Sequence, residues 1–349
     1  MAYISFQPND YFNTLLYTDN GANRTLTGVG FQPDWVWIKT RNHANSHNLF
    51  DSVRGANKTI RSNLDNAEVT TTDTLTAFTS DGFSLGVDAS GYGVNYDNKN
   101  EVSWNWKAGN SAGSSNSDGN ITSTVSVNTT AGFSIVKYTG NETGTRTIGH
   151  GLGAVPQMII VKNLDDGSLN WPVYHHRLGN TKYLLLNDTA AQQTSSNYWA
   201  DTTPTSSVFS VGGNHNVNQN SKDFIAYCFA EKNGFSKFGR YVGNGNADGQ
   251  FMYTGFKPAW LMLKQTGTQG WFLVDNKRPS HFNPIDGSLH PNSSAVEDTS
   301  SDFFVDFLAN GFKLRDSDAQ LNGNNNDYIY AAFAAEPLVS SNNIPATAR

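Results

Sequence analysis

A ten-residue pattern that occurs three times constrains the fold of this chain more than any other sequence feature. The copies begin at Gly30, Gly153 and Gly255, and each has proline at its fourth position, followed by an apolar run that ends in lysine. Repetition at a near-constant spacing indicates a chain built from similar structural units. The spacing of roughly 100 residues is the size of one small domain.

Three further blocks recur in the same order and support the same register. They occupy 63–68, 187–192 and 292–297, then 81–85, 207–211 and 310–314, and finally 102–106, 225–229 and 329–333. Four blocks in one order indicate three homologous units. We therefore predict repeats over 1–109, 121–232 and 233–337, a flexible Gly/Ser/Asn-rich linker at 110–120 and a C-terminal arm at 338–349.

The composition favours strands over helices. Charged residues make up only 15% of the 349 residues, and the chain has 41 Asn but only six Glu. Helix formers are therefore scarce, while residues that favour turns are abundant. Aromatic residues at 12% supply enough apolar area for a packed core. We expect an all-β protein made of three tandem β-sandwich domains.

The apolar run in the first block predicts a strand that is buried on both faces. Trp35 and Trp37 alternate with Val36 and Ile38, and alternate side chains of a strand point to opposite faces. The lysine that ends each run (Lys39, Lys162 and Lys264) is expected to mark the point where the strand meets solvent, with its aliphatic stem covering the edge of the core.

The second block has the spacing of a helix capping box. In each unit Ser, Thr or Asp precedes Glu or Gln by three positions. We therefore predict one short helical turn per unit, capped by the pairs Asp65 and Glu68, Thr189 and Gln192, and Ser294 and Glu297.

Charge, hydropathy and cysteine content exclude several classes of protein. A net charge of −6 without a Lys/Arg run longer than two argues against nucleic-acid binding. The longest apolar runs are too short for a transmembrane helix, so we expect no membrane insertion. The single Cys228 cannot form an internal disulfide. The N-terminal residues lack the pattern of a signal peptide, so we expect synthesis in a cytosol.

The carboxylates and histidines do not form a recognisable catalytic or metal-binding motif. A glycosidase needs a carboxylate pair, and the few Glu residues are explained by capping boxes, strand starts and loops. His43 and His47 have the i, i+4 spacing of a zinc pair, but a solvated polar loop is the favoured interpretation. His175 and His176 stand where the other units have aspartate, which favours surface variation. We predict no enzyme activity, no cofactor and no metal.

Two Asn/Asp/Gly-rich segments resemble the start of a calcium loop. They are 19–23 and 244–249, and the second lacks the Glu expected at its twelfth position. Hairpin turns explain both segments, and we favour that interpretation over calcium binding.

Aromatic residues in polar surroundings are the main candidates for a binding site. Stacked rings beside Asn and Asp could hold a sugar or a protein partner. The alternative is that most of these rings close the ends of the sandwiches. The candidates are Trp171, Trp199, Tyr198, Trp271, Tyr92 and Tyr96.

The repeated phrases resemble a known group of virion proteins. GFQPDWVWIKTRN, LFDSVRGANKTIRSN, WNWKAG, GLGAVPQMIIVKN and YTGFKPAWLMLK are similar to phrases in structural proteins of tailed phages of marine bacteria, usually described as tail fibre or appendage proteins with repeated β-sandwich domains. The similarity covers about residues 12–337. It implies a virion component and, with the strand count, a jelly-roll or concanavalin-like topology.

The resemblance implies a tail fibre or appendage that contributes to host-surface attachment. The expected partners are other virion proteins and a host-surface glycan, and the expected location is the virion, assembled in the host cytoplasm. Exposed sheet edges must be paired or covered, so we expect a homo-oligomer, with a trimer favoured, and terminal segments 1–12 and 338–349 docked on a neighbouring virion protein. The alternatives are a head or tail decoration protein with only structural contacts, and a carbohydrate-binding module.

Overall fold

A computed structural model describes residues 7–96, 98–142, 144–278, 283–300 and 304–335, together with the backbone of 338–339 and 345–346. Antiparallel strands make up nearly all of its regular structure. The helices in the described ranges are the two single turns α1 (Ser196–Trp199) and α2 (His215–Asn218) and the 3-10 turn η1 (Pro8–Asp10). The all-β prediction is therefore confirmed.

The first unit consists of a main sheet with the strand order β1-β9-β3-β4-β5-β6 and an outer sheet with the order β2-β8-β7. The strands are β1 (Phe12–Thr18), β2 (Arg24–Thr27), β3 (Trp35–Thr40), β4 (Asn48–Asp51), β5 (Lys58–Arg61), β6 (Val69–Thr70), β7 (Leu75–Thr79), β8 (Gly82–Leu85) and β9 (Asn100–Trp106).

The second unit has the main sheet β10-β11-β12-β19-β14-β15-β16-β17 and the outer sheet β13-β18. The strands are β10 (Ser114–Asn116), β11 (Ser123–Asn128), β12 (Phe133–Thr139), β13 (Arg146–Gly149), β14 (Met158–Asn163), β15 (Pro172–His175), β16 (Lys182–Leu185), β17 (Gln193–Thr194), β18 (Val208–Val211) and β19 (Asp223–Phe229). Strand β10 lies inside the predicted flexible linker and pairs with β11, so this part of the linker is sheet.

The third unit has the main sheet β20-β26-β22-β23 and the outer sheet β21-β25-β24. The strands are β20 (Ser236–Val242), β21 (Phe251–Tyr253), β22 (Pro258–Gln265), β23 (Trp271–Asp275), β24 (Val305–Leu308), β25 (Gly311–Leu314) and β26 (Asp327–Ala334). In the predicted C-terminal arm, β27 (Leu338–Val339) pairs with β28 (Pro345–Ala346). The rest of that arm and residues 1–6 of the predicted N-terminal docking segment lie outside the described residues.

The same four-strand order occurs in all three main sheets. It is β1-β9-β3-β4 in the first unit, β12-β19-β14-β15 in the second and β20-β26-β22-β23 in the third. A tyrosine on the first strand of each set donates its hydroxyl to a backbone carbonyl outside the sheets: Tyr17 to Val94 at 2.9 Å, Tyr138 to Val217 at 2.7 Å, and Tyr241 to Leu321 at 2.7 Å. The sequence repeat therefore corresponds to a repeated strand arrangement.

Strand β3 is buried on both faces, as its sequence predicted. Val36 and Ile38 point into the core between the two sheets of the first unit. Trp35 and Trp37 point the other way, into a core that all three units share. Each main sheet thus buries the face that a solitary sandwich would expose to water.

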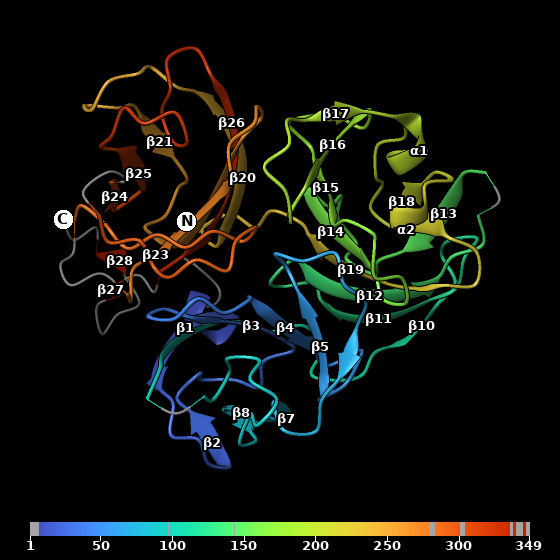
Figure 1. Cartoon of the computed structure of the whole chain (residues 1–349). Helices are drawn as coiled ribbons and strands as arrows, with labels where there is room; N and C mark the ends of the chain where they lie inside the picture. Colours follow the sequence, from blue (N-terminus) through green and yellow to red (C-terminus); the bar gives the residue numbers. More distant parts are fainter. Residues whose placement is uncertain are drawn as a thin grey trace.

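The shared core lies where the three main sheets face one another around a common centre (Figure 1). The ring of Trp35 stacks on Tyr227 of the second unit with centroids 4.3 Å apart. Trp106 packs edge-on against Trp260 of the third unit at 5.5 Å. Phe229 contacts Phe333, which joins the second and third units. Buried aromatic area of this kind is a large stabilising contribution.

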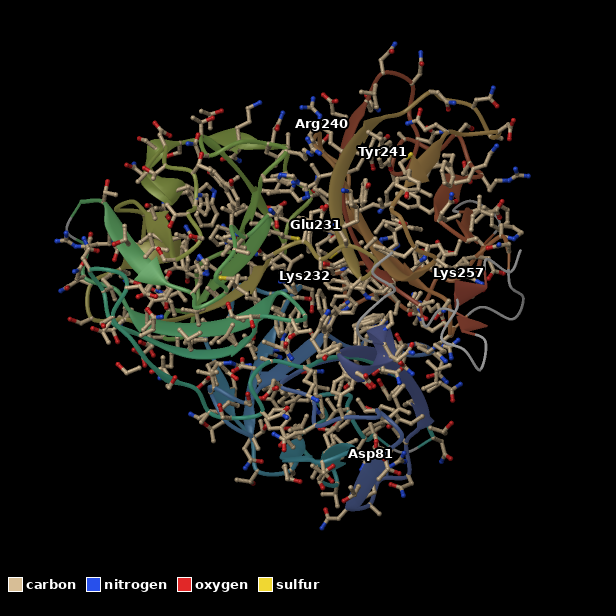
Figure 2. The ribbon with its side chains drawn as sticks, turned by 180° about the vertical axis from the view of Figure 1, so that it is seen from behind. Asp81, Glu231, Lys232, Arg240, Tyr241 and Lys257 are labelled. Carbon is tan, nitrogen blue, oxygen red and sulfur yellow. The ribbon has the colours of Figure 1, made fainter. Side chains whose placement is uncertain are left out.

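The chain passes from the second unit to the third at Glu231 and Lys232, near the middle of the molecule (Figure 2). The amide of Glu231 donates to Gln157 in the second unit. Its carboxylate accepts from Lys237 at 2.7 Å and from the amide of Phe238 at 3.2 Å in the third unit. Glu231 therefore links the second unit to the third through both its backbone and its side chain.

The capping-box prediction is wrong in all three units. Segments 63–68, 187–192 and 292–297, which we call the straps, are turns followed by extended chain. Each strap crosses to the next unit, where the amide of its last residue donates to a carbonyl: Glu68 to Leu164 at 2.8 Å, Gln192 to Thr266 at 2.8 Å, and Glu297 to Arg41 at 2.7 Å. The three straps close a ring of units, with the third strap returning to the first unit.

The first residue of each strap also fixes its own unit. The side-chain oxygens of Asn63, Asn187 and Asn292 accept the backbone amides of residues 47, 171 and 271 at 3.0, 3.0 and 2.8 Å. The repeated block is therefore conserved within the chain as a junction between units, not as a helix start.

The lysines that end the apolar runs are buried, contrary to prediction. Lys39, Lys162 and Lys264 are each 0% exposed. Lys162 donates to the carbonyls of Asp65, in the first strap, and Leu169, at 2.8 and 2.7 Å. Burial lowers the pKa of each of the three amines to about 8. The strand does not end in solvent, because the strap of another unit covers it.

Candidate binding groove

Two buried clusters of opposite charges lie at the ring junctions. In the first unit Arg54 binds Asp51 at 2.5 Å and Glu68 at 3.1 Å. Burial alone would lower the pKa of Arg54, but the Asp51 and Glu68 carboxylates raise it. The Tyr227 hydroxyl of the second unit donates to Asp51 at 2.8 Å.

The third unit repeats this cluster. Arg278 binds Asp275 at 2.5 Å and Glu297 at 2.7 Å. The Trp104 indole of the first unit donates to Asp275 at 2.9 Å, and Glu297 also binds Arg41 of the first unit at 2.7 Å. The charges are paired and hydrogen-bonded, so these clusters hold the junctions and are not available for chemistry.

The second unit has neutral residues at the same positions. His175 replaces the aspartate, and its Nε2 lies 3.2 Å from the carbonyl of Tyr330 in the third unit. Leu178 replaces the arginine and packs against the shared core, and Gln192 replaces the glutamate. Burial lowers the pKa of His175 to about 3. His175 is thus part of a junction between units, and the prediction of surface variation is wrong.

A pair of carboxyl groups is buried beneath the first unit's loops. Asp19 is 3% exposed and Glu101 is 0% exposed, and burial raises the pKa of both groups. The two carboxyls also repel each other when both are charged, so the pair favours holding a proton. Neither group is accessible to a substrate.

The groove that opens to solvent lies where the first unit meets the third strap. Its volume is about 790 Å³, within the usual range of roughly 300–1,000 Å³ for ligand sites. Most of its lining is polar. The lining residues are Ala44, Asn45, Ser46, Arg61, Val69, Thr70, Thr71, Thr72, Asp73, Val87, Ala89, Ser90, Gly91, Tyr92 and Ser294.

Two carboxylates, the buried Asp88 and the partly exposed Asp73, hold the loop that carries Tyr92. Asp88 accepts the amides of Tyr92 at 2.9 Å and Gly93 at 2.7 Å. Asp73 accepts the amide of Ser90 at 3.0 Å and also binds its hydroxyl. Gly93 has a φ of +78°, and a Cβ there would overlap the side chain of Asn45. This wall of the groove is therefore formed before any ligand arrives.

Tyr92 and Arg61 lie together in the groove. The guanidinium of Arg61 lies over the Tyr92 ring, 5.4 Å from its centroid. Arg61 is at the end of β5, opposite Asn48 of β4, so a regular strand positions it. The site combines an aromatic ring, a cation and hydroxyl groups, which is suitable for binding a polar ligand.

The other aromatic candidates lie elsewhere, and four of them are buried. Trp171 and Trp271 donate their indole N–H groups to carbonyls of neighbouring units, Leu64 at 2.9 Å and Leu185 at 2.8 Å. Trp199 and Tyr198 lie in the core of the second unit. Tyr96 is 52% exposed but does not line the groove. The prediction of exposed contact residues is wrong for the four buried rings.

The histidine and calcium interpretations also change. His47 is buried and accepts from the Trp37 indole at 2.9 Å, so it is not a solvated loop histidine, whereas His43 is exposed. Segments 19–23 and 244–249 each connect a main sheet to an outer sheet and are not hairpin turns. In the second segment, Asn244 is held by Asn322 at 2.8 Å.

No three His, Cys, Asp or Glu side chains among the described residues come together in a way that could hold a metal ion. Within the same ranges, no helix is long and apolar enough to cross a membrane. Cys228 is buried, and burial raises the pKa of its thiol.

The sequence prediction found Tyr92 but missed the rest of the groove. Arg61, Asp73 and Ser90 lie outside the four repeated blocks, so the repeat gave no signal there. Two sequence signals of loops that could bind polar groups were available. They are the run Thr70–Thr71–Thr72–Asp73 and, in a later segment, Gly91 and Gly93 on either side of Tyr92.

Comparison with known proteins identifies a family that covers most of the chain. The model of a family described as a domain of unknown function, DUF7483, matches residues 7–337. No curated protein and no solved structure matches the chain.

Proposed function

The chain belongs to the DUF7483 family, and we propose that it is a non-catalytic virion protein of a tailed phage, a tail fibre or appendage that contributes to host-surface attachment. The resemblance of its repeated phrases to virion proteins supports the phage assignment. In this proposal the protein is assembled in the host cytoplasm and contacts other virion proteins.

The observation that carries the attachment function is the position of Tyr92. Its ring lies in an open groove of about 790 Å³ whose walls supply hydroxyl and amide groups. An aromatic ring can stack on the apolar face of a sugar, while hydroxyls and amides bind its polar edge. We therefore propose a host-surface glycan as the ligand of this groove.

The proposal includes three tandem β-sandwich domains of jelly-roll or concanavalin type. The recurring strand order supports it. We also propose a homo-oligomer, with a trimer favoured. The three units of one chain already meet in a ring, so this oligomer would be built from sheet edges such as β6 and β17, and not from the shared core.

Adsorption of the protein to host cells tests the attachment function. Purified full-length protein is expected to bind host cells and to compete with phage adsorption. Tyr92→Ala is expected to lower binding by about fivefold or more, because stacking of a flat ligand on an aromatic ring contributes about 1–3 kcal/mol in the comparable case of nucleic-acid bases. Tyr96→Ala, an exposed tyrosine outside the groove, is the matched control and is expected to bind normally. Absence of binding by the wild-type protein would refute this function.

The rigid shared core favours a second candidate, a head or tail decoration protein whose loops contact only other virion proteins. The number of copies per particle separates the two. A tail appendage is expected in a few to a few dozen copies, whereas a head decoration occurs in hundreds. Quantitative mass spectrometry of purified particles measures this number.

A further inference from the structure

We infer that the ligand of the groove is an acidic saccharide whose carboxylate binds Arg61. This inference rests on the proposed glycan-binding function and adds the chemical class of the sugar. It depends on three observations: the lack of an ion pair at Arg61, the hydrogen bonds of the one acidic side chain that lines the groove, and the hydroxyl groups on the remaining walls.

Arg61 is a cation without a counter-ion among the described residues. The side chain of Arg61 makes none of the ion pairs or hydrogen bonds found in the described part of the chain. Its one described contact is the Tyr92 ring, which orients the guanidinium by a cation–π interaction. A planar guanidinium held in this way offers two parallel N–H groups to a carboxylate, which is its preferred partner.

Asp73 is the acidic side chain that lines the groove. Its carboxylate oxygens accept the amide of Ser90 at 3.0 Å and the hydroxyl at 3.2 Å, so it holds the loop, and among the described residues it forms no ion pair with Arg61. The positive charge of Arg61 is therefore available to a ligand.

The remaining walls present free hydroxyl groups. Thr70, Thr72 and Ser294 are exposed, and their hydroxyls have no hydrogen-bond partner among the described residues. Ser294 belongs to the third strap, so the groove receives donors from both sides of a junction between units. Hydroxyls around one cation fit a sugar that carries one acidic group.

Calorimetric titration of the full-length protein tests the inference. The probes are an oligosaccharide that contains uronic acid, the same oligosaccharide with its carboxyl groups reduced to alcohols, and a sulfated neutral oligosaccharide. We expect the uronate to bind about tenfold to a hundredfold more tightly than the reduced form, since a charge-assisted bidentate pair is stronger than neutral hydrogen bonds. Added salt is expected to weaken binding of the uronate alone.

Variants assign the difference to Arg61. Arg61→Gln is expected to bind the uronate no better than the reduced sugar, and Arg61→Lys is expected to retain part of the preference. Arg177→Gln, an exposed arginine outside the groove, is the control and is expected to behave as wild type. If Arg61→Gln does not fold, the salt dependence of the wild type and Arg61→Lys still decide the question.

The possible failures are distinguishable. Equal binding of the uronate and the reduced sugar overturns the acidic-sugar inference and leaves the glycan-binding function intact. Binding of the sulfated probe alone overturns the assignment of a carboxylate. Binding of none of the probes, by a protein that also fails to adsorb to host cells, overturns the proposed function itself.

Discussion

The junctions of the first and second units place different chemistry on the same backbone. In the first unit Asp51, Arg54 and Glu68 form a buried cluster of charges, whereas in the second unit His175, Leu178 and Gln192 occupy the same positions without charge. Both straps nevertheless make the same amide-to-carbonyl bond. The backbone therefore determines the geometry of the junction. The side chains determine how much unfolding free energy is lost when the junction is disturbed.

The largest effect is expected when one member of the charged cluster is removed. Arg54→Leu leaves Asp51 buried without a cation, while Glu68 keeps its pair with Lys58 at 3.1 Å, so the variant is expected to reduce the free energy of unfolding by about 3–5 kcal/mol. Chemical denaturation measures the change. Arg240→Leu breaks an exposed pair with Asp327 and is the control, with an expected loss of about 1 kcal/mol or less. Equal losses in the two variants would contradict this view of the cluster.

Lowering the pH is expected to reduce the stability of the neutral junction, by which we mean the junction of the second unit with His175, Leu178 and Gln192. His175 has a pKa of about 3 in the folded chain, against an ordinary value of about 6.5. Between these values the unfolded chain binds a proton that the folded chain does not, so stability falls as the pH falls. From pH 7 to pH 4 this single group is expected to cost about 3 kcal/mol.

Denaturation at both pH values isolates this contribution. His175→Asn is expected to lose less stability on acidification than wild type, by that amount. His43→Asn changes an exposed histidine and should leave the pH dependence unaltered. Identical acid sensitivity of all three proteins would show that the neutral junction is not sensitive to acid.

A smaller effect is expected at the hydrogen bond that joins the two units. Tyr227 donates to a buried carboxylate, so Tyr227→Phe is expected to cost about 2 kcal/mol of unfolding free energy. Tyr138 donates to a neutral carbonyl in the same unit, and Tyr138→Phe should cost about 1 kcal/mol. Thermal and chemical denaturation give both values, and a reversed order would contradict the importance of the charged acceptor.

The smallest effect is expected when the whole cluster is replaced. The triple variant Asp51→His, Arg54→Leu and Glu68→Gln gives the first unit the residues of the second. Replacement of all the buried charges together is often neutral or stabilising, so a net change of about 1 kcal/mol or less is expected. A loss as large as that of Arg54→Leu alone would show that the two junctions are not interchangeable.

The sequence was sufficient for the parts of the fold that follow from local periodicity. The alternation of Trp35 and Trp37 with Val36 and Ile38 predicted burial on both faces, and the order of the four blocks predicted a repeated arrangement. The sequence could not identify which residues cover the two faces of this strand. Lys39 lies near the end of β3, and nothing in the adjacent sequence indicates that a strap from another unit covers it.

The site was predicted less well, because its contacts also come from segments that are distant in the sequence. A spacing of three residues between Asp65 and Glu68 fits a capping box and an extended strap equally well. Trp171 and Trp271 have polar neighbours in sequence but apolar neighbours in space, because their contacts come from other units. Tyr92 was identified because the polar residues beside it in the sequence belong to the same loop of the groove. Arg61 was missed because it lies at the end of β5, which is distant from that loop in the sequence.

The return of the third strap to Arg41 closes the ring of three units within one chain. Every junction uses unlike surfaces in the same direction, and such contacts form a closed ring only when their rotations add up to a full turn. Three units complete that turn around the shared aromatic core. The closure means that each of the three straps has its acceptor carbonyl within this one chain, so the ring needs no second molecule to satisfy these backbone groups.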